Sequence, residues 1–304
     1  MHFSVVIPLY NKENHIKRAI YSVLNQTYQN FELIVINDGS TDRSVEKVKE
    51  FSDSRIKLVE QKNKGVSAAR NLGIKLSKNN YIAFLDADDA WEPSFLQVIK
   101  ELIEKYPDAG AYCTSYKFVK NNKSVLIRKV FNDQPNTKDG LIDYFKKSLK
   151  NPVITASSVV IPKKVFLDLG CFPEGIKRGE DQDMWIRIAL KYPVAASNEI
   201  CSIYYLNTEN RSIHYKYDRT ESLASYAEQI LIKEKNKGNN SVYFEEYMIR
   251  AIIIYAKYLI NDNQKVEARK LLKKYKYTKF NRILWVKTYL YSIDIVRRIY
   301  NLLK

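Results

Sequence analysis

Three aspartates follow one another closely at the end of an apolar run. The run occupies residues 81–85, and Asp86, Asp88 and Asp89 come directly after it in the stretch "FLDADDAW". Like charges this close are unfavourable unless a cation or hydrogen bonds offset them. Carboxylate oxygens are the hard ligands that Mg²⁺ and Mn²⁺ prefer, and such ions complete their coordination with substrate phosphates and water. The pattern therefore indicates a divalent cation that holds a diphosphate, and solvated loop acids are the simpler alternative.

Two further stretches offer groups that could meet such a ligand. Asp38 in "VINDGSTD" lies among turn-forming residues, so a turn explains it without any ligand. The stretch "KNKGVSAARNLGI" at 62–74 places small residues where a helix begins, which permits close approach of the backbone to a ligand or to a sheet. Close packing does not account for Arg70, whose guanidinium could pair with phosphate or with the aspartates.

Alternating strand and helix patterns must position these residues. The strands are expected at 4–10, 31–38, 56–61 and 81–86, and the helices at 13–26, 41–51 and 66–77. Such alternation predicts an α/β fold with a mostly parallel, Rossmann-like sheet covered by helices on both faces. Ligands bind beyond the carboxyl ends of the strands in such sheets. That edge would collect the residues that follow the apolar runs, namely Pro8, Tyr10, Asn11, Asn37, Asp38, Gly39, Ser40, Asp86, Asp88 and Asp89.

The alternation loosens after residue 110. A hairpin is expected over "AYCTSYKFV" and "KSVLIRKVF", a strand over 157–162 and a helix over 179–193. From about 216 onward the pattern is helical. There the stretch "KYLINDNQKVEARKLLKKYK" predicts a helix hairpin with Ala268, Leu271 and Leu272 inside.

The 304 residues carry 50 Lys and Arg against 34 Asp and Glu, a formal net charge of +16. An excess of this size indicates a polyanionic partner such as nucleic acid, acidic lipid or a phosphorylated substrate. Residues 265–304 contribute most of it, because they hold twelve basic residues against Glu267 and Asp294, a net charge of +10.

Neither a disulfide framework nor a membrane span is predicted. The three cysteines are odd in number and their spacings are unlike C-x-x-C, which fits a reducing compartment. The chain runs from Met1 directly into "FSVVIPLYN", without the pattern of a signal peptide. The apolar piece at 251–260 contains Lys257 and falls short of the roughly 18–20 residues that span a bilayer. A cytoplasmic protein, free or peripheral on a membrane, is expected.

An apolar stripe with three-and-four spacing runs along the last part of the chain. Such a stripe packs most often against its own protein, but a basic amphipathic helix also lies on anionic membranes. Nucleic acid is a third alternative, because "KLLKKYKYTKFNR" mixes basic and aromatic residues; no recognition motif accompanies it, so no nucleic-acid partner is expected. The stripe comprises Val286, Tyr289, Ile293, Val296, Tyr300 and Leu303, with Lys287, Asp294 and Arg298 on another side.

Five motifs together resemble the inverting nucleotide-sugar transferases of glycosyltransferase family 2, which have a GT-A fold. The motifs "VVIPLYNKENHI", "VINDGSTD", "GVSAARNLGI", "FLDADDAW" and "GEDQDMWIRIA" occur in the family's order within residues 3–215. The resemblance implies a sugar donor activated as a nucleoside diphosphate, commonly UDP. It also implies addition of a single sugar, because the Gln-x-x-Arg-Trp stretch of processive members is missing from this sequence.

The resemblance implies roles for residues on the donor side. Asp88 is expected to bind Mn²⁺ or Mg²⁺ on the diphosphate, with Asp89 as a neighbour, and Asp86 is expected near the ribose. His214 could touch the diphosphate. The positions that match the nucleoside pocket and its vicinity are Pro8, Tyr10, Asp38 and Arg70.

The resemblance places the catalytic base in the pair Glu180 and Asp181, with Asp181 preferred. A positioned carboxylate can accept the proton of a sugar hydroxyl late in the reaction. Acids in the first turn of a helix are also favoured by the helix dipole, without any catalytic purpose.

The resulting hypothesis is a metal-dependent, inverting glycosyltransferase that moves one sugar from a nucleoside-diphosphate sugar to a hydroxyl of a cell-surface glycan or a lipid-linked saccharide. Residues 1–215 would form the transferase domain, with a donor half at 1–110 and an acceptor half at 111–215, and residues 216–304 a basic helical region. A sugar-nucleotide nucleotidyltransferase is one alternative, although "IPLYNKENH" lacks the glycine-rich loop of that class. A basic, non-catalytic nucleic-acid-binding protein is the other.

Overall fold

The computed structural model describes residues 1–121, 123–134, 136–208 and 221–293. The chain divides into two compact units. The first, named the sheet unit, comprises Met1–Tyr144, Pro152–Gly175 and Glu180–Tyr215. The second, named the helical unit, comprises Phe145–Asn151, Ile176–Gly179 and Lys216–Lys304.

Strands and helices alternate through the first part of the sheet unit. They are β1 (Phe3–Leu9), α1 (Ile16–Leu24), β2 (Phe31–Asp38), α2 (Ser44–Lys49), β3 (Ile56–Gln61), α3 (Val66–Leu76) and β4 (Tyr81–Phe84). The four strands are parallel, as the alternation predicts, and they lie in the order β3-β2-β1-β4. Pro8 pairs with Ile36 and Leu9 with Asn37, so the carboxyl ends of β1 and β2 meet at one edge of the sheet.

The later part of the sheet unit adds strands of both directions. Its elements are β5 (Ala90–Trp91), α4 (Phe95–Lys105), β6 (Ala111–Lys120), β7 (Lys123–Arg128), β8 (Asp139–Ile142), the 3₁₀ turn η1 (Ala156–Ser158), β9 (Val159–Pro162), α6 (Lys163–Leu169), α7 (Glu180–Lys191) and β10 (Val194–Tyr205). The short helix α5 (Tyr144–Ser148) belongs, apart from Tyr144, to the helical unit. β9 lies between β4 and β6 and is antiparallel to both, whereas β6 and β10 are parallel. β6 and β7 form the predicted hairpin. The ten strands found in the described residues therefore form a mixed sheet, and β1 to β4 make up its parallel half.

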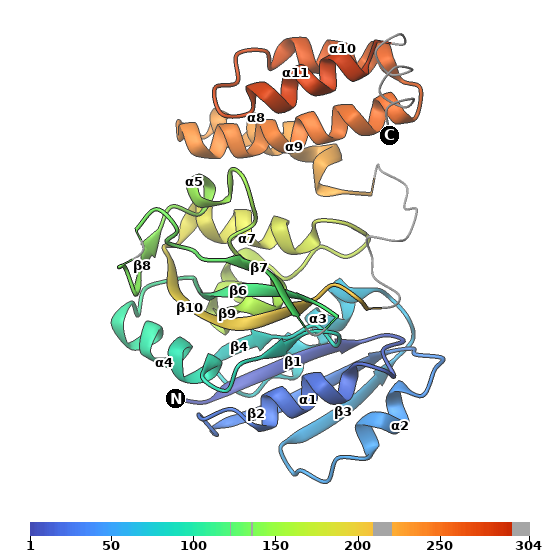
Figure 1. Ribbon diagram of the computed structural model, residues 1–304, viewed down its shortest axis with the longest axis vertical. Coiled ribbons are helices and arrows are strands. Elements are labelled where there is room, and N and C mark those ends of the chain that lie inside the picture. Colours follow the sequence, from blue (N-terminus) through green and yellow to red (C-terminus); the bar gives the residue numbers. More distant parts are fainter. Residues whose placement is uncertain (122, 135, 209–220, 294–304) are drawn as a thin grey trace. The chain divides into compact units, whose positions relative to one another are not determined.

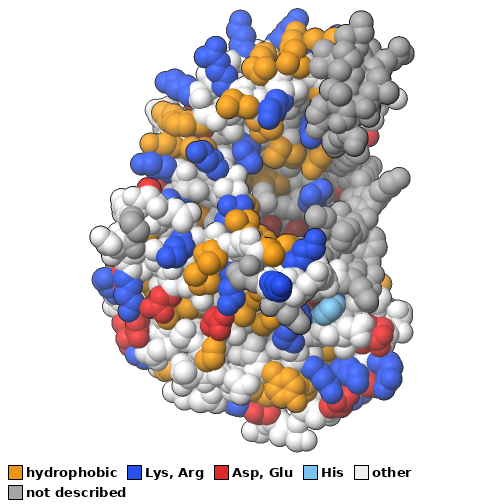
Figure 2. Space-filling model, in the orientation of Figure 1, with side chains coloured by type: hydrophobic (Ala, Val, Ile, Leu, Met, Phe, Trp, Pro, Cys, Tyr) orange, Lys and Arg blue, Asp and Glu red, His pale blue; other side chains and the backbone are white. Residues whose placement is uncertain are grey.

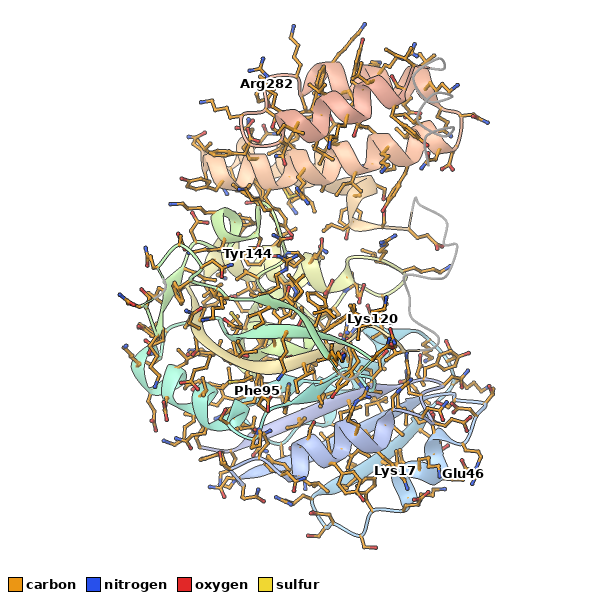
Figure 3. The ribbon with its side chains drawn as sticks, in the orientation of Figure 1. Lys17, Glu46, Phe95, Lys120, Tyr144 and Arg282 are labelled. Carbon is orange, nitrogen blue, oxygen red and sulfur yellow. The ribbon has the colours of Figure 1, made fainter. Side chains whose placement is uncertain are left out.

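Helices cover both faces of this sheet (Figure 1). On one face, α1 and α4 share a buried core with alternate residues of β1 such as Val5 and Ile7. At the start of α4, Phe95 stacks on Trp91 with ring centroids 4.1 Å apart (Figure 3). On the other face, α3 packs on β1 and β2, and Phe166 of α6 meets the ring of Phe84. Burial on both faces explains why β1, β2 and β4 read as nearly continuous apolar runs.

Two glycines of the "KGVSAARNLGI" stretch serve the fold in different ways. Gly73 lies so close to β1 that a Cβ atom would collide with Val6, which confirms the close-packing explanation for that small residue. A Cβ at Gly65 would meet nothing within 4 Å, but its φ of +90° is a conformation that only glycine adopts readily. Gly65 therefore sets the direction in which the chain enters α3.

The helical unit contains α8 (Leu223–Asn236), α9 (Val242–Asn261), α10 (Lys265–Lys274) and α11 (Arg282–Tyr291). α9 and α10 form the predicted helix hairpin, in which Ala268 and Leu272 are buried and Leu271 is half-buried. None of the helices that the structure describes combines the length and the apolar composition needed to cross a bilayer. The predicted stripe is described only as far as Ile293; Asp294, Val296, Arg298, Tyr300 and Leu303 lie outside the described residues.

Candidate functional site

A single guanidinium joins the two acidic motifs of the sequence. Arg70 of α3 is only 3% exposed, and it donates to Asp86 Oδ1 at 2.8 Å and to Glu180 Oε1 at 3.0 Å. Asp86 comes just after β4, whereas Glu180 begins α7, 110 residues from Arg70 in the sequence. The ring of Phe172 lies 5.4 Å from the guanidinium. The fold thus brings both acidic motifs to the carboxyl end of β4.

The charge of Arg70 is held in place by the acids around it. Burial alone would lower the pKa of Arg70, but the charges of Asp86, Glu180 and Asp181 outweigh burial and raise that pKa above its ordinary value. A buried guanidinium with two carboxylate partners is stable only as a complete set, because removal of the cation leaves the acids uncompensated. Arg70 therefore organises the centre of the site.

Two cations surround Asp88. Lys12, in the loop after β1, places its Nζ 2.7 Å from Asp88 Oδ2, and both side chains are largely buried. Arg18 of α1 donates to the backbone carbonyl of Asp88, and its guanidinium lies 3.5 Å from the centre of the Tyr205 ring. Burial would raise the pKa of Asp88, but the ion pair with Lys12 holds it below its usual value. Asp88 is therefore a carboxylate with two positively charged neighbours, Lys12 and Arg18.

Asp89 has a different environment from its neighbours. It is buried and accepts hydrogen bonds from Ser157 Oγ at 2.6 Å and from the backbone N–H of Tyr205 at 3.3 Å. Burial and the charges of Asp88 and Asp86 raise its pKa well above the usual value. Ser157 also accepts from the backbone N–H of Asp86 at 3.1 Å. Asp89 thus ties the acidic loop to the middle of the sheet.

Asp38 fixes the loop that leads into α3. Its Oδ1 accepts from Gln61 Nε2 at 2.7 Å and from the backbone N–H of Lys64 at 2.9 Å. Its Oδ2 accepts from the backbone N–H of Gly65 at 2.8 Å. Gly39, directly after Asp38, has a φ of +74°, in agreement with the predicted turn. The carboxylate therefore connects the end of β2 to the loop after β3.

Tyr10 lies at the same edge of the sheet, after Pro8 and the end of β1. Its side chain is substantially exposed, whereas Pro8 is buried within the strand. The next residue, Asn11, connects this loop to the turn after β2, because its Oδ1 accepts from the N–H of Thr41 at 2.8 Å and its own N–H donates to Ser40 Oγ at 3.1 Å. An exposed ring on a fixed loop can stack on a flat ligand such as a nucleobase.

Asp181 lies in the first turn of α7, and its pKa is shifted. Burial, together with the charge of Glu180, raises the pKa of Asp181 to about 7, although Arg70 opposes the shift. Its Oδ1 accepts from the backbone N–H of Gln182 at 2.7 Å. A carboxylate with a pKa near neutrality is well matched to accept a proton at physiological pH.

The donor set at the acidic loop suits a hard divalent cation. Asp88 and Asp86 offer carboxylate oxygens, and Mg²⁺ or Mn²⁺ bound beside a diphosphate needs only one or two of them from the protein. Among the residues that the structure describes, no group of three or more His, Cys, Asp and Glu side chains could hold a metal by itself. The residues therefore fit a cation whose remaining ligands come from the substrate, and Lys12 must then share Asp88 with it.

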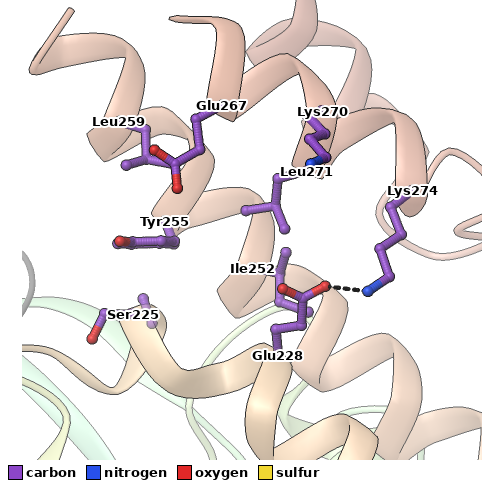
Figure 4. A pocket seen from close by; sticks show the side chains of 10 residues that line it. Ser225, Glu228, Ile252, Tyr255, Leu259, Glu267, Lys270, Leu271 and Lys274 are labelled. Carbon is purple, nitrogen blue, oxygen red and sulfur yellow. Dashed lines mark hydrogen bonds and ion pairs between the residues drawn. The ribbon is translucent and has the colours of Figure 1, made fainter. Parts of the chain in front are cut away.

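The helical unit contains a separate pocket of about 290 Å³ between α8, α9 and α10 (Figure 4). Glu228 and Lys274 form an ion pair of 2.7 Å beside it, and Tyr255, Leu259 and Leu271 contribute to its lining. It contains none of the residues that the sequence singles out for chemistry. We therefore place the candidate functional site at the acidic loop of the sheet unit.

Some residues of the site are not predicted from the sequence. Lys12 follows Tyr10 and Asn11 in the first motif, so its position after β1 is a signal that could have indicated it. Arg18 and Ser157 carry no such signal, because each reaches the acidic loop only through tertiary contacts. His214 lies outside the part of the chain that the structure describes.

The fold and the matched residues define a family. Residues 4–170 match the family described as Glycosyl transferase family 2, so the chain belongs to that family, and the sheet unit has the GT-A fold. This confirms the resemblance and the fold that the five motifs imply. The roles of individual site residues, the metal and the inverting course stay predictions.

Individual relatives of known name are glycosyltransferases, which agrees with membership of this family. The chain is 35% identical over 212 residues, 69% of this chain and 79% of the relative, to WfgD of Escherichia coli, a UDP-Glc:alpha-D-GlcNAc-diphosphoundecaprenol beta-1,3-glucosyltransferase. It is 43% identical over 117 residues, 38% of this chain and 17% of the relative, to glycosyltransferase GlyA of Streptococcus pneumoniae serotype 4. The crystal structure of S. aureus TarS 1–349 in complex with UDP-GlcNAc has a TM-score of 0.66 at 17% identity, over 96% of this chain and 82% of that one.

The extent of these similarities differs between relatives. At 17% identity, the likeness to TarS concerns the fold alone. Besides the 17% of GlyA, the chain spans 26% and 45% of the length of two Rickettsia glycosyltransferases that it matches. It thus corresponds to less than half of several relatives.

Proposed function

We propose that this protein is an inverting glycosyltransferase that moves one sugar from a nucleoside-diphosphate sugar, with UDP as the expected nucleotide, to a hydroxyl group of a saccharide acceptor. Membership of glycosyl transferase family 2 supports this activity over the nucleotidyltransferase and nucleic-acid-binding alternatives. The name of WfgD, a UDP-Glc-dependent enzyme acting on a diphosphoundecaprenol-linked sugar, supports a UDP-sugar donor and a lipid-linked acceptor.

One observation carries the proposal: Arg70 contacts two acidic motifs at once. It pairs with Asp86 of "FLDADDAW", which we name the donor motif, and with Glu180 of "GEDQDMWIRIA", which we name the base motif. A transferase must hold the anomeric carbon between the leaving diphosphate and the attacking hydroxyl, so the two acidic motifs have to converge. The structure provides this convergence around a buried cation that keeps the acids close despite their like charges.

The reaction uses residues of both motifs. Asp181 accepts the proton of the acceptor hydroxyl while the hydroxyl oxygen forms a bond to the anomeric carbon. The bond from that carbon to the diphosphate oxygen breaks, and its electron pair leaves with the nucleoside diphosphate. Attack occurs on the face opposite the diphosphate, so the configuration inverts. Lys12 and Arg18 beside Asp88 supply fixed positive charge where negative charge develops on the leaving group.

Asp88 is the residue that would hold the Mg²⁺ or Mn²⁺ ion. A bound divalent cation compensates the charge of the diphosphate oxygens. The ammonium of Lys12 lies 2.7 Å from Asp88 Oδ2. Its positive charge would therefore also compensate the negative charge of the diphosphate. Asp86, which pairs with Arg70, is the residue that we expect to contact the ribose of the donor.

The decisive experiment screens nucleotide sugars for binding and metal-dependent turnover, with and without Mn²⁺. We expect thermal stabilisation by UDP and slow release of UDP from one UDP-sugar when Mn²⁺ is present. Absence of any response to UDP, or an equal response to every nucleotide without metal, contradicts the proposal.

Asp88→Asn should weaken nucleotide binding selectively in the presence of metal. The amide is a poorer ligand for a hard cation, so we expect the Kd of UDP with Mn²⁺ to rise about tenfold or more, about 1.4 kcal/mol. Isothermal titration calorimetry measures it. Asp168→Asn, an acid of a surface ion pair with Lys191, is the matched control and should bind UDP as wild type does. An unchanged Kd for Asp88→Asn would remove Asp88 from the metal site.

Activity should depend on pH through Asp181. Its pKa is raised to about 7, so the carboxyl is protonated below that pH and cannot accept the hydroxyl proton. We expect kcat/KM to fall about tenfold for each pH unit below 7 and to level off above it. Asp181 is faced by Glu180 on its own helix, Arg70 from α3 and Asp86 after β4, so the measured value belongs to this coupled group. A profile that stays flat down to pH 5 would exclude Asp181 as the base.

We also propose a cytoplasmic location at a membrane surface, where a lipid-linked saccharide is accessible. The three cysteines are free in the structure, as suits a reducing compartment. The excess of basic residues after position 265 supports contact with anionic lipid.

A further inference from the structure

Helix α11 exposes aliphatic side chains along one side. Ile283 is 74% exposed, Val286 41% and Leu290 43%. Their spacing of three and four residues puts them on a single side of the helix. Lys287 is exposed on this side as well. We name the surface formed by Ile283, Val286, Lys287 and Leu290 the α11 face.

The opposite side of α11 is fixed to the rest of the helical unit. Trp285 donates its indole N–H to the carbonyl of Leu272 at 2.7 Å, and Thr288 is buried. Arg269 of α10 donates to the carbonyl of Ser292, just after the helix, at 2.6 Å. These contacts determine the rotation of α11 about its axis. The aliphatic residues of the α11 face are therefore exposed because the helix is anchored through its other side.

The surroundings of the α11 face are strongly basic. In the described residues from 265 to 293, nine lysines and arginines stand against the single acid Glu267, a net charge of +8. Figure 2 shows Lys and Arg side chains next to hydrophobic ones on the visible side of the helical unit. Arg282 begins the helix and is exposed (Figure 3). The remaining eight are Lys265, Arg269, Lys270, Lys273, Lys274, Lys276, Lys279 and Lys287.

We infer that the α11 face binds the surface of an anionic phospholipid membrane. The aliphatic side chains would enter the boundary between headgroups and acyl chains, and the basic side chains would contact the lipid phosphates, as an interfacial helix does. The inference deepens the proposed function, since it names the surface on which a lipid-linked acceptor is met. Vesicle binding is measured without donor or acceptor, so its failure and the failure of sugar transfer are distinguishable.

The basic charge and the exposed aliphatic side chains of the α11 face together favour lipid over the other partners that a basic surface can bind. A nucleic acid would use the basic side chains, but its phosphates offer nothing to three exposed aliphatic residues. Contact with a second copy of this chain would bring like charges together, because the same surface is basic in both copies. An anionic membrane satisfies both features of the α11 face at once.

The test is sedimentation of the full chain with vesicles of phosphatidylcholine alone and of phosphatidylcholine mixed with phosphatidylglycerol. We expect binding to the mixed vesicles and little binding to phosphatidylcholine alone. Equal binding to both compositions, or binding to neither, overturns the inference.

Variants separate the apolar from the basic contribution. Ile283→Ser combined with Leu290→Ser should lower the partition coefficient on mixed vesicles about tenfold or more, because two inserted aliphatic groups are lost. Arg282→Glu should lower it about fivefold or more, since a basic contact with the lipid surface becomes an acidic one. Circular dichroism and thermal unfolding check that each variant is folded.

Matched controls lie in the sheet unit. Leu141→Ser with Leu167→Ser removes two leucines that are 55% and 83% exposed, and Lys57→Glu reverses an exposed charge, so both variants should bind vesicles as wild type does. If the α11 variants sediment like these controls, the α11 face is not the lipid surface. If instead Arg282→Glu weakens binding to a DNA duplex while the serine variant binds both DNA and vesicles as wild type does, the surface is a nucleic-acid site and the inference fails.

Discussion

Replacing Asp181 with Asn should lower kcat about 10²–10⁴-fold, the range that a positioned general base contributes. The amide cannot accept the proton of the acceptor hydroxyl, yet it preserves the size of the side chain. Nucleotide binding should stay within about twofold of wild type, because Asp181 contacts no residue of the donor motif by hydrogen bond among those described. Initial rates of UDP release with a saturating donor, paired with UDP titration, measure the two quantities.

A control on the same helix separates catalysis from the loss of a negative charge. Asp183 lies in the first turn of α7 and pairs with Arg187 at 2.7 Å, so Asp183→Asn changes the charge of the helix N-terminus without touching the Arg70 group. We expect kcat for Asp183→Asn close to that of wild type. Full activity of Asp181→Asn would exclude this residue as the base, and Glu180→Gln would then be the next variant to assay.

Replacing Arg70 with Met should lower the free energy of unfolding by about 3 kcal/mol or more, as expected when one partner of a buried ion pair is removed. The aliphatic chain preserves much of the packing against Phe172, but Asp86 and Glu180 lose their shared cation. Urea unfolding followed by circular dichroism measures the change. Donor binding should also weaken, because the loop that carries Asp86 is no longer held.

Two companion variants test the reason for this loss. Arg70→Lys retains a positive charge, but a single ammonium cannot reproduce the fork that contacts both carboxylates, so it should be intermediate in stability. Arg55→Met breaks a more exposed pair with Asp53 and should cost about 1 kcal/mol or less. Equal losses for Arg70→Met and Arg55→Met would contradict a special role for the buried bridge.

The sequence predicts the parallel half of the fold closely. The strands predicted at 31–38 and 56–61 have the bounds of β2 and β3. For β2 the reason is its nearly continuous apolar run, which reports burial on both faces. The helix predicted at 13–26 occupies only Ile16–Leu24, and residues 13–15 form a turn. The N–H groups of Lys12 and Glu13, at the start of this turn, donate to Ser44 and Asp42 in the neighbouring turn. The spacing of apolar residues along the sequence cannot reveal such a tertiary hydrogen bond.

The strand pairing in the mixed half of the sheet is harder to predict from the sequence. The hairpin of β6 and β7 follows from two apolar runs around a turn. The position of β9 between β4 and β6 does not follow from any local pattern, because its partners come from distant parts of the chain. The same limit explains why Ser157, directly before β9, is not predicted as a partner of Asp89.

The residue types at the candidate site are predictable, but their individual environments are not. Asp86, Asp88 and Asp89 look alike in the sequence, yet they pair with Arg70, Lys12 and Ser157 respectively. Partner identity is set by which side chains the fold brings to the end of β4. Sequence spacing therefore indicates where the acids gather, while the division of tasks among them depends on tertiary structure.

The three hydrogen bonds that Asp38 accepts bear on how a nucleotide is captured. They hold the loop before α3 through contacts within the protein, so one wall of the proposed nucleoside site is preorganised. Association then loses little conformational entropy, and no slow folding of that loop has to precede it. Encounter by diffusion, assisted by the basic surface, should set the rate at which the donor is taken up.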